Sequence, residues 1–366
     1  MNKLIAFNSF NLYKNMKSFL RIILVFIIVT YSNNIYSQKK TTIEGKISNK
    51  VEKDTILFVP GMLDKKYYEV SEISAEVIDN KFRIKQSFFY PQRYFLAWKS
   101  ERNNVPFHSE SFFLDNSTKT ITVGSKNETV GNSSLEFTKK FIPYMLKGTS
   151  IGDIETYEYE HGLEFDSKLL SYIKQNPDSY VALWFLIERF DGNGYSAIYD
   201  DAMGLFSNKI KTGKLWGIIS KEIKNIRIRQ NEKFPQLVLK DIDLKSDKII
   251  LSEQKIVLID FWFSRCKPCL AQLPKLKEIY ERFASTNKFE IIGISTDKTV
   301  NIDLWKKRVS ENQLKWKNYL DENAFESNKE KIRSFPTNFL VDANGVVIKK
   351  NISLLDLEEF LNKNLK

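Results

Sequence analysis

The chain has 366 residues, 42% of them hydrophobic, which is enough to form the cores of about two or three domains. Its formal net charge is +11, and residues 1–37 carry four basic residues and no acid. Elsewhere lysines and arginines alternate with acids, which is typical of a solvated surface and disfavours a nucleic-acid-binding patch.

Residues 1–37 have the three parts of a secretory signal. Basic residues lead into the apolar run 22–30, and Ser37 provides a small residue at a cleavage position. We therefore predict a signal peptide over 1–37 and export to the periplasm or cell envelope, where disulfides persist. The apolar run is shorter than the roughly twenty residues of a membrane-spanning helix, but an uncleaved membrane anchor is the alternative interpretation.

Residues 38–125 contain several segments in which apolar and polar side chains alternate, as in strands with one buried face. Turn residues such as Pro60-Gly61 and Asp79-Asn80 separate them. Short strands at this spacing predict a small antiparallel β domain resembling a sandwich. The segments are 41–48, 55–59, 81–85, 94–98 and 119–123.

Residues 126–233 have apolar side chains at helical spacing and predict a helical connecting domain. We interpret aromatic residues such as Trp184 and Phe185 as core residues, although a docking surface for a partner is the alternative.

Residues 234–366 alternate between strand and helix patterns, which predicts an α/β domain with a mixed sheet flanked by helices. An Asn-Gly turn signal at 342–345 indicates a hairpin. The predicted strands are 256–263, 289–295, 335–341 and 346–350, and the predicted helices are 270–283, 303–311 and 354–365.

The chain has two cysteines, Cys266 and Cys269, placed between a predicted strand and a predicted helix. They pair with each other or remain free, since there is no third cysteine. A structural zinc site needs four ligands, and the two histidines, His108 and His161, belong to no ligand cluster. The sequence therefore predicts no metal site and no cofactor, and the cysteine spacing favours redox chemistry.

Cys266 is expected to be the attacking cysteine because it lies where the helix begins. Unpaired amide groups at a helix start and the charges of Arg265 and Lys267 favour its thiolate, which is the reactive form. Pro268 suits the first helical turn, where a missing N–H costs nothing. Cys269 lies one turn into the helix, so we predict that it is less exposed and resolves the mixed disulfide.

The residues around the cysteines resemble a known family. Asp260-Phe-Trp-Phe-Ser-Arg-Cys-Lys-Pro-Cys269 and Ser334-Phe-Pro-Thr337 resemble motifs of the thioredoxin fold. With the export signal and the strand–helix insert through 289–320, residues 234–366 resemble exported TlpA/ResA-like thiol-disulfide oxidoreductases. Residues 38–125 are similar, by pattern alone, to the β-rich N-terminal domain often fused to such proteins.

The resemblance implies roles for individual positions, including a redox-active disulfide between Cys266 and Cys269. Pro336 matches the family's cis-proline, which lies against the two sulfurs and leaves the backbone before it, at Phe335, free to pair with a substrate strand. Asp260 matches the buried acid of thioredoxin, which could take a proton from the resolving cysteine. An ordinary trans-proline and a partly solvated aspartate are the alternatives, and Trp262 fits packing as well as function.

Two positions depart from the family. Arg265 stands where the family usually has Trp, and Gln272 stands where ResA-like members often carry a Glu near the sulfurs. An added positive charge and a lost negative charge both favour the thiolate, so we predict a low pKa for Cys266. Because a stabilised thiolate stabilises the reduced form, the reduction potential should lie on the oxidising side of thioredoxin, between about −270 and −120 mV.

These features predict an exported thiol-disulfide oxidoreductase that exchanges disulfides with protein substrates. Such an enzyme needs an external electron partner, which we expect to be a membrane-bound reductase. The alternative is a binding or assembly protein of the cell envelope that uses its thioredoxin-like module for docking or redox sensing. A third hypothesis is a disulfide isomerase, which would need a dimer to hold its substrates.

Overall fold

The structure, a computed structural model, describes residues 40–48, 55–61, 63–98, 111–124, 128–251 and 254–365. The predicted signal peptide lies outside these residues. Within them, no helix combines the length and the apolar character needed to cross a membrane. They form two compact units, one up to Val59 plus Glu69–Ser134 and one of Pro60–Tyr68 plus Leu135–Lys366. The division into three domains at residues 125 and 233 stays a prediction.

The described part of the first unit is built from two four-stranded sheets, in the orders β4-β1-β7-β8 and β3-β2-β5-β6. The alternating segments all form strands, and their buried side chains, such as Ile43 and Phe58, form the core. All pairings are antiparallel except that of β1 with β7, which is parallel. The strands are β1 (Thr41–Ile47), β2 (Thr55–Val59), β3 (Ile73–Glu76), β4 (Lys81–Gln86), β5 (Gln92–Trp98), β6 (Phe112–Leu114), β7 (Thr120–Val123) and β8 (Glu128–Val130).

The chain between the two sheet-forming parts is helical, as predicted. Its longest helices are α5 and α6, and α6 is buried on most of its surface, with Trp184 and Phe185 in the core. A π-helical turn at Phe137–Phe141 joins α2 to α3. The helices are α2 (Asn132–Glu136), α3 (Ile142–Met145), α4 (Ile154–Glu160), α5 (Gly162–Gln175), α6 (Tyr180–Asn193), α7 (Ala197–Leu205), α8 (Asn208–Lys211) and α9 (Lys214–Asn225).

The C-terminal part contains a mixed sheet whose described strands follow the order β10-β9-β13-β12-β11-β14-β15. Its strands are β9 (Val238–Lys240), β10 (Ser246–Lys248), β11 (Ile256–Trp262), β12 (Phe289–Ser295), β13 (Lys317–Leu320), β14 (Thr337–Val341) and β15 (Val347–Lys350). Its helices are α10 (Lys267–Ala284), α11 (Ile302–Glu311), α12 (Phe325–Lys329) and α13 (Leu354–Asn364). The α/β prediction is confirmed, but the pattern missed β9, β10, β13 and α12.

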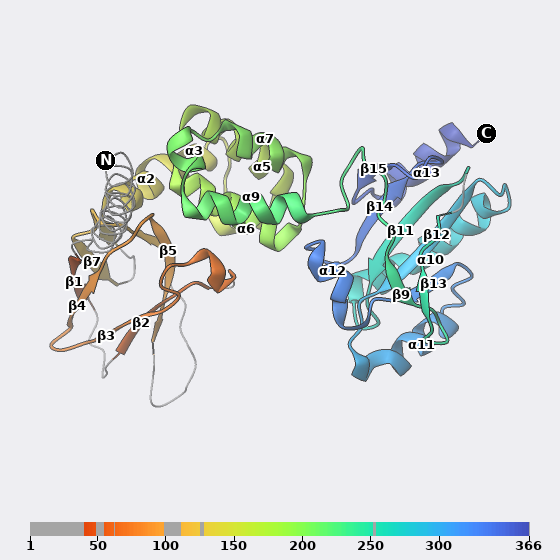
Figure 1. Cartoon of the computed structure of the whole chain (residues 1–366), viewed down its shortest axis with the longest axis horizontal. Coiled ribbons are helices and arrows are strands. Elements are labelled where there is room, and N and C mark those ends of the chain that lie inside the picture. The colour runs from red at the N-terminus through yellow and green to blue at the C-terminus, as the bar shows by residue number, and fades with distance from the viewer. Residues whose placement is uncertain are drawn as a thin grey trace, which may run out of the picture. The chain divides into compact units, whose positions relative to one another are not determined.

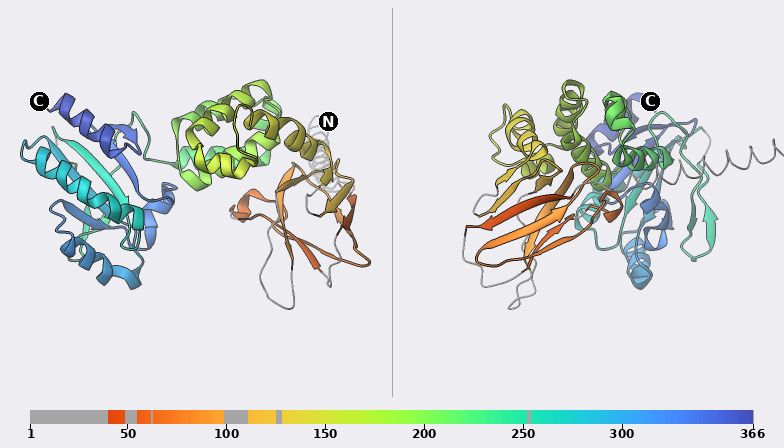
Figure 2. Two further views of the ribbon diagram at one scale, coloured as in Figure 1. Left: turned by 180° about the vertical axis from the view of Figure 1, so that it is seen from behind. Right: turned by 60° about the vertical axis from the view of Figure 1, so that its left-hand side comes forward.

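Strand β11 lies inside this sheet and is buried along its whole length. It runs parallel to β12 and antiparallel to β14. Leu258 faces a core shared with Leu273 of α10 and Leu361 of α13, and Ile259 faces a second core that includes Ile228. Figure 1 shows the helices packed against the sheet, and Figure 2 gives two further views. The buried strand therefore fixes the position of the loop that follows it.

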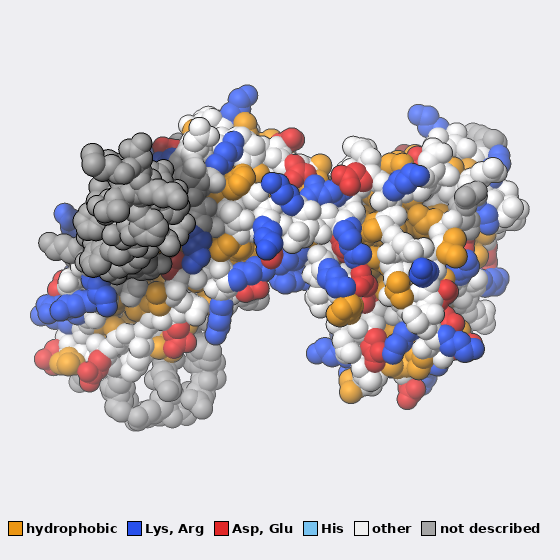
Figure 3. Space-filling view, viewed as in Figure 1, with side chains coloured by type: hydrophobic (Ala, Val, Ile, Leu, Met, Phe, Trp, Pro, Cys, Tyr) orange, Lys and Arg blue, Asp and Glu red, His pale blue; other side chains and the backbone are white. Residues whose placement is uncertain are grey.

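Basic and acidic side chains are interspersed on the face drawn in the space-filling view (Figure 3). This mixture matches the charge alternation of the sequence.

Candidate active site

Cys266 and Cys269 lie at the junction of β11 and α10 and form a disulfide, with their Cα atoms 5.2 Å apart. Cys266 is the N-cap residue of α10, and Pro268 lies in the first helical turn, as predicted. The backbone N–H of Cys269 donates to Sγ of Cys266 at 3.2 Å. An amide donor at a helix start favours negative charge on this sulfur, so the local geometry supports a reactive thiolate once the pair is reduced.

The two cysteines are equally buried, each with 3% of its surface exposed. The prediction that Cys269 is less exposed than Cys266 is therefore wrong for the disulfide form. The reason is that the disulfide draws both sulfurs into one apolar cluster, against which Phe263 and Phe335 also pack. Exposure therefore does not distinguish the two cysteines, whereas Cys266 differs from Cys269 in being the N-cap residue of α10.

Asp260 lies on β11 and is 7% exposed. Because side chains alternate along a strand, it points to the same face as Leu258 and Trp262, whose side chains share a core with both cysteines. Burial away from water raises the pKa of the Asp260 carboxyl to about 7. At neutral pH the carboxyl is therefore present in both protonation states on the side of the sheet that holds the cysteines.

The loop before β14 lies against the cysteine loop. The Phe335–Pro336 peptide bond is cis. The Phe335 ring packs edge-to-face on Phe263, with ring centroids 5.4 Å apart, and Thr337 pairs with Phe261 of β11. The structure thus brings together the two motifs that the sequence placed about 70 residues apart.

The remaining predicted residues surround this site. Arg265 and Lys267 are exposed beside Cys266, and Gln272 is half-buried in α10. Trp262 is buried in the core, so it contributes packing. Among the residues that the structure describes, no group of His, Cys, Asp and Glu side chains could hold a metal ion.

Asp297, which was not predicted as a site residue, follows β12 and is 2% exposed. Its carboxylate accepts hydrogen bonds from the Ser264 N–H at 2.8 Å, the Ser264 hydroxyl at 2.7 Å and the Ser295 hydroxyl at 2.6 Å. These bonds tie the loop that carries Cys266 to the end of the neighbouring strand. A signal was present, because polar residues at the carboxyl end of a parallel strand meet those of the next strand.

Comparison with known proteins agrees with this geometry. A family model described as thioredoxin-like matches residues 254–347. The thiol-disulfide oxidoreductase ResA of Bacillus cereus is 30% identical over 151 residues, which cover 40% of this chain and 83% of ResA. The chain belongs to the ResA family of thiol-disulfide oxidoreductases. The predicted resemblance of the C-terminal part and the enzyme class are therefore confirmed. Export and the resemblance of residues 38–125 to the N-terminal domain of such proteins stay predictions.

Solved structures match a slightly smaller share of the chain than ResA does. The thioredoxin domain of a thiol-disulfide oxidoreductase from Bacteroides vulgatus is 28% identical, with a TM-score of 0.34, and the match covers 37% of this chain and 98% of that domain. A thiol:disulfide interchange protein from Bacteroides sp. is 27% identical, with a TM-score of 0.34, and the match covers 38% of this chain and 91% of that protein. The match to the thioredoxin-like family model contains both cysteines, Asp260 and Pro336.

Proposed function

We propose that this chain exchanges disulfides with protein substrates through Cys266 and Cys269. When it acts as a reductase, the Cys266 thiolate attacks one sulfur of a substrate disulfide, and the other substrate sulfur leaves as a thiolate that takes up a proton. The Cys269 thiolate then attacks Sγ of Cys266 and releases the second substrate thiol. Two electrons pass to the substrate, and the Cys266–Cys269 disulfide forms. Oxidation of a substrate dithiol is the reverse sequence.

Asp260 serves as the proton acceptor for Cys269 in this proposal. A carboxyl with a pKa of about 7 can accept the thiol proton near neutral pH and return it to solvent. Its place on the face of β11 that packs against the cysteines supports this role. An aspartate that remained fully ionised in water would be a much weaker base.

The loop before Pro336 is the proposed contact for a substrate strand. Phe335 packs against Phe263 of the cysteine loop. A substrate strand that paired with the backbone before Pro336 would therefore lie next to the disulfide. Arg265 and Lys267 are exposed and add positive charge beside Cys266, which favours its thiolate.

The proposed setting is the cell envelope, reached through the predicted signal over residues 1–37. Each reductive cycle leaves Cys266 and Cys269 oxidised, so the enzyme needs an electron donor. A membrane-bound reductase is the proposed donor, since soluble thiol reductants belong to the cytosol.

The observation that carries this proposal is the placement of Cys266 as the N-cap of α10, with an amide donor at its sulfur. A full-length Cys269→Ser variant can form the mixed disulfide but cannot resolve it. It should therefore accumulate covalent adducts with envelope proteins, which migrate more slowly than the free variant on non-reducing gels. The matched Cys266→Ser variant should trap few adducts. Equal trapping by the two variants, or none by either, would contradict the assigned roles.

A further inference from the structure

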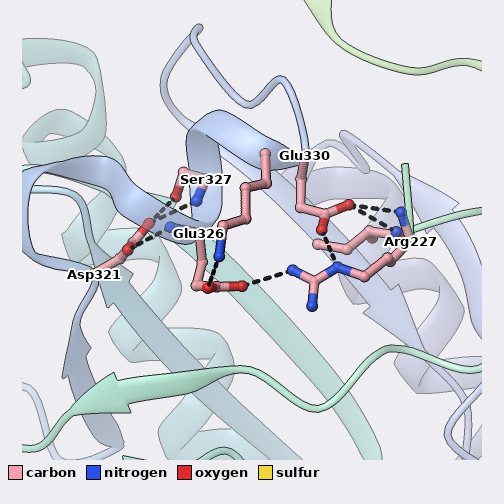
Figure 4. A network of polar contacts seen from close by, with 7 residues as sticks. Arg227, Asp321, Glu326, Ser327 and Glu330 are labelled. Carbon is pink, nitrogen blue, oxygen red and sulfur yellow. Dashed lines mark hydrogen bonds and ion pairs between the residues drawn. The ribbon is translucent and has the colours of Figure 1, made fainter. Parts of the chain in front are cut away.

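The segment between β13 and the Pro336 loop has an irregular backbone. Asn323, Ala324 and Lys331 have left-handed φ values of 59°, 57° and 55°, which non-glycine residues adopt at a cost. Asp321 stabilises the first turn of α12, because its carboxylate accepts hydrogen bonds from the backbone N–H groups of Glu326 and Ser327 (Figure 4). A segment of this kind needs outside contacts to keep one conformation.

Glu330 supplies the first contact with the helical part of the same unit. Its side chain is 1% exposed. Its carboxylate accepts hydrogen bonds from the backbone N–H groups of Arg227 and Ile228, at 2.8 and 3.1 Å. It also accepts a hydrogen bond from Nε of Arg227 at 2.6 Å. The same guanidinium donates to Glu326 at 2.6 Å (Figure 4). These hydrogen bonds therefore join the segment that follows α9 to α12 and to Glu330, the residue after α12.

Asp191, in the last turn of α6, supplies the second contact. Its carboxylate is 5% exposed and accepts hydrogen bonds from Nζ of Lys331 and Nη1 of Arg333, each at 2.7 Å. Lys331 also pairs with Glu222 of α9 at 3.0 Å. Because an unpaired buried charge is strongly disfavoured, these contacts specify the positions of Lys331 and Arg333 tightly. Arg333 is three residues before Pro336.

The backbone at the end of α6 approaches the same segment directly. A Cβ atom on Gly194 would lie 2.6 Å from the carbonyl oxygen of Lys331, so only glycine fits this approach. Nζ of Lys350, on β15, donates to the carbonyls of Asn193 and Tyr195 at 2.9 Å each. These contacts do not depend on the Asp191 carboxylate, yet they join the same two regions.

We propose that the helical part holds residues 330–333, and through them the loop that ends in Pro336, in the position that receives a substrate strand. Asp191 and Glu330 are positioning residues for protein substrates. This inference rests on the proposed function, in which the backbone before Pro336 pairs with the substrate. The residues that follow Pro336 do not depend on these contacts for their position, because they form β14, which pairs with β11 and β15.

The test uses the full chain with the substitutions Asp191→Asn and Glu330→Gln, and Asp201→Asn, at an exposed site on α7, as the matched control. Insulin reduction is measured with dithiothreitol as electron source, together with the reduction potential of the cysteine pair. The expected result is a KM for insulin raised about tenfold in both variants, the size expected for one lost charge-assisted hydrogen bond. The kcat and the potential should stay within about twofold, and the control should match the wild type.

An unchanged KM in folded Asp191→Asn and Glu330→Gln chains would overturn the inference, as would a fall in kcat and a shifted potential with KM unchanged. If Asp191→Asn does not fold, Arg333→Gln replaces it, because Arg333 is 40% exposed and its loss leaves the Asp191–Lys331 pair. A KM for insulin that Arg333→Gln leaves unchanged would then refute the inference. Failure of the proposed function is distinct, since the wild type itself would then not reduce insulin.

Discussion

Replacing Asp260 by asparagine should stabilise the oxidised chain above neutral pH. Burial raises the pKa of the carboxyl from an ordinary 3.8 to about 7 in the folded state. As the pH rises from about 4 to 7, the unfolded chain gives up this proton before the folded chain does. The free energy of unfolding of the wild type therefore falls across this window, and it levels off above pH 7. Asparagine does not titrate, so the free energy of unfolding of the variant does not fall in this way as the pH rises.

The magnitude follows from the rise in pKa. At 1.36 kcal/mol for each pKa unit, a rise from 3.8 to about 7 corresponds to about 4 kcal/mol of stability lost by the wild type above pH 7. The advantage of Asp260→Asn should therefore grow from near zero at pH 4 to about 4 kcal/mol at pH 8. About half of that difference should be present near pH 5.5.

The assay is urea unfolding of the oxidised wild type and variant between pH 4 and 8.5. Cys266 and Cys269 are joined in a disulfide, so they have no proton to exchange. The control is Asp243→Asn, because Asp243 is exposed in the same part of the chain. A difference between Asp260→Asn and the wild type that stays constant across this pH range would refute the argument. So would the same pH dependence in the control.

The same substitution should slow substrate release. Without the carboxylate, Cys269 loses the proton acceptor that we propose for it, and general-base catalysis typically contributes about a hundredfold or more. Rapid-quench measurement of mixed-disulfide decay should show this loss at pH 7, with recovery at higher pH where the thiol ionises unaided. Release as fast as in the wild type would exclude Asp260 as the base.

Three other substitutions test the packing and the charge of the site. Leu258→Ala, at a fully buried position, should lower the free energy of unfolding by about 2–5 kcal/mol in urea. Asp297→Asn leaves one serine donor without its acceptor and should cost about 1–3 kcal/mol; a change below about 0.5 kcal/mol would contradict the role of this carboxylate. Replacing Arg265 and Lys267 together by glutamine should slow alkylation of reduced Cys266 at pH 6–7, and 1 M salt should shrink the effect. Equal alkylation rates at low salt would argue against a contribution from these charges.

The local patterns of the sequence predicted the centre of the site. The apolar run at 256–263 became β11, and the amphipathic run that follows became α10, because both signals depend on residues within a few positions of one another. The motif at the junction predicted the positions of Cys266 and Pro268 for the same reason. The parallel pairing of β1 with β7 and the strand β13 escaped prediction, since short strands take their identity from their neighbours.

The equal burial of Cys266 and Cys269 could not be read from helical position, because the disulfide and the Phe335 ring, which comes from another loop, decide it. Asp297 bonds to Ser264 across 33 residues of chain, and Asp191 bonds to Lys331 across 140. The strand ends gave a signal for Asp297, but no sequence pattern pairs Asp191 with Lys331.

The sequence by itself determined the redox motif, the strand and helix that carry it, and membership of its C-terminal part in a family. These follow from hydrophobic periodicity and from the spacing of a few residue types. Only the tertiary structure decided the pKa of Asp260, the bonds of Asp297 and the contacts of Asp191 with the segment before Pro336. Burial and charge pairing are properties of groups that folding brings together from distant parts of the chain.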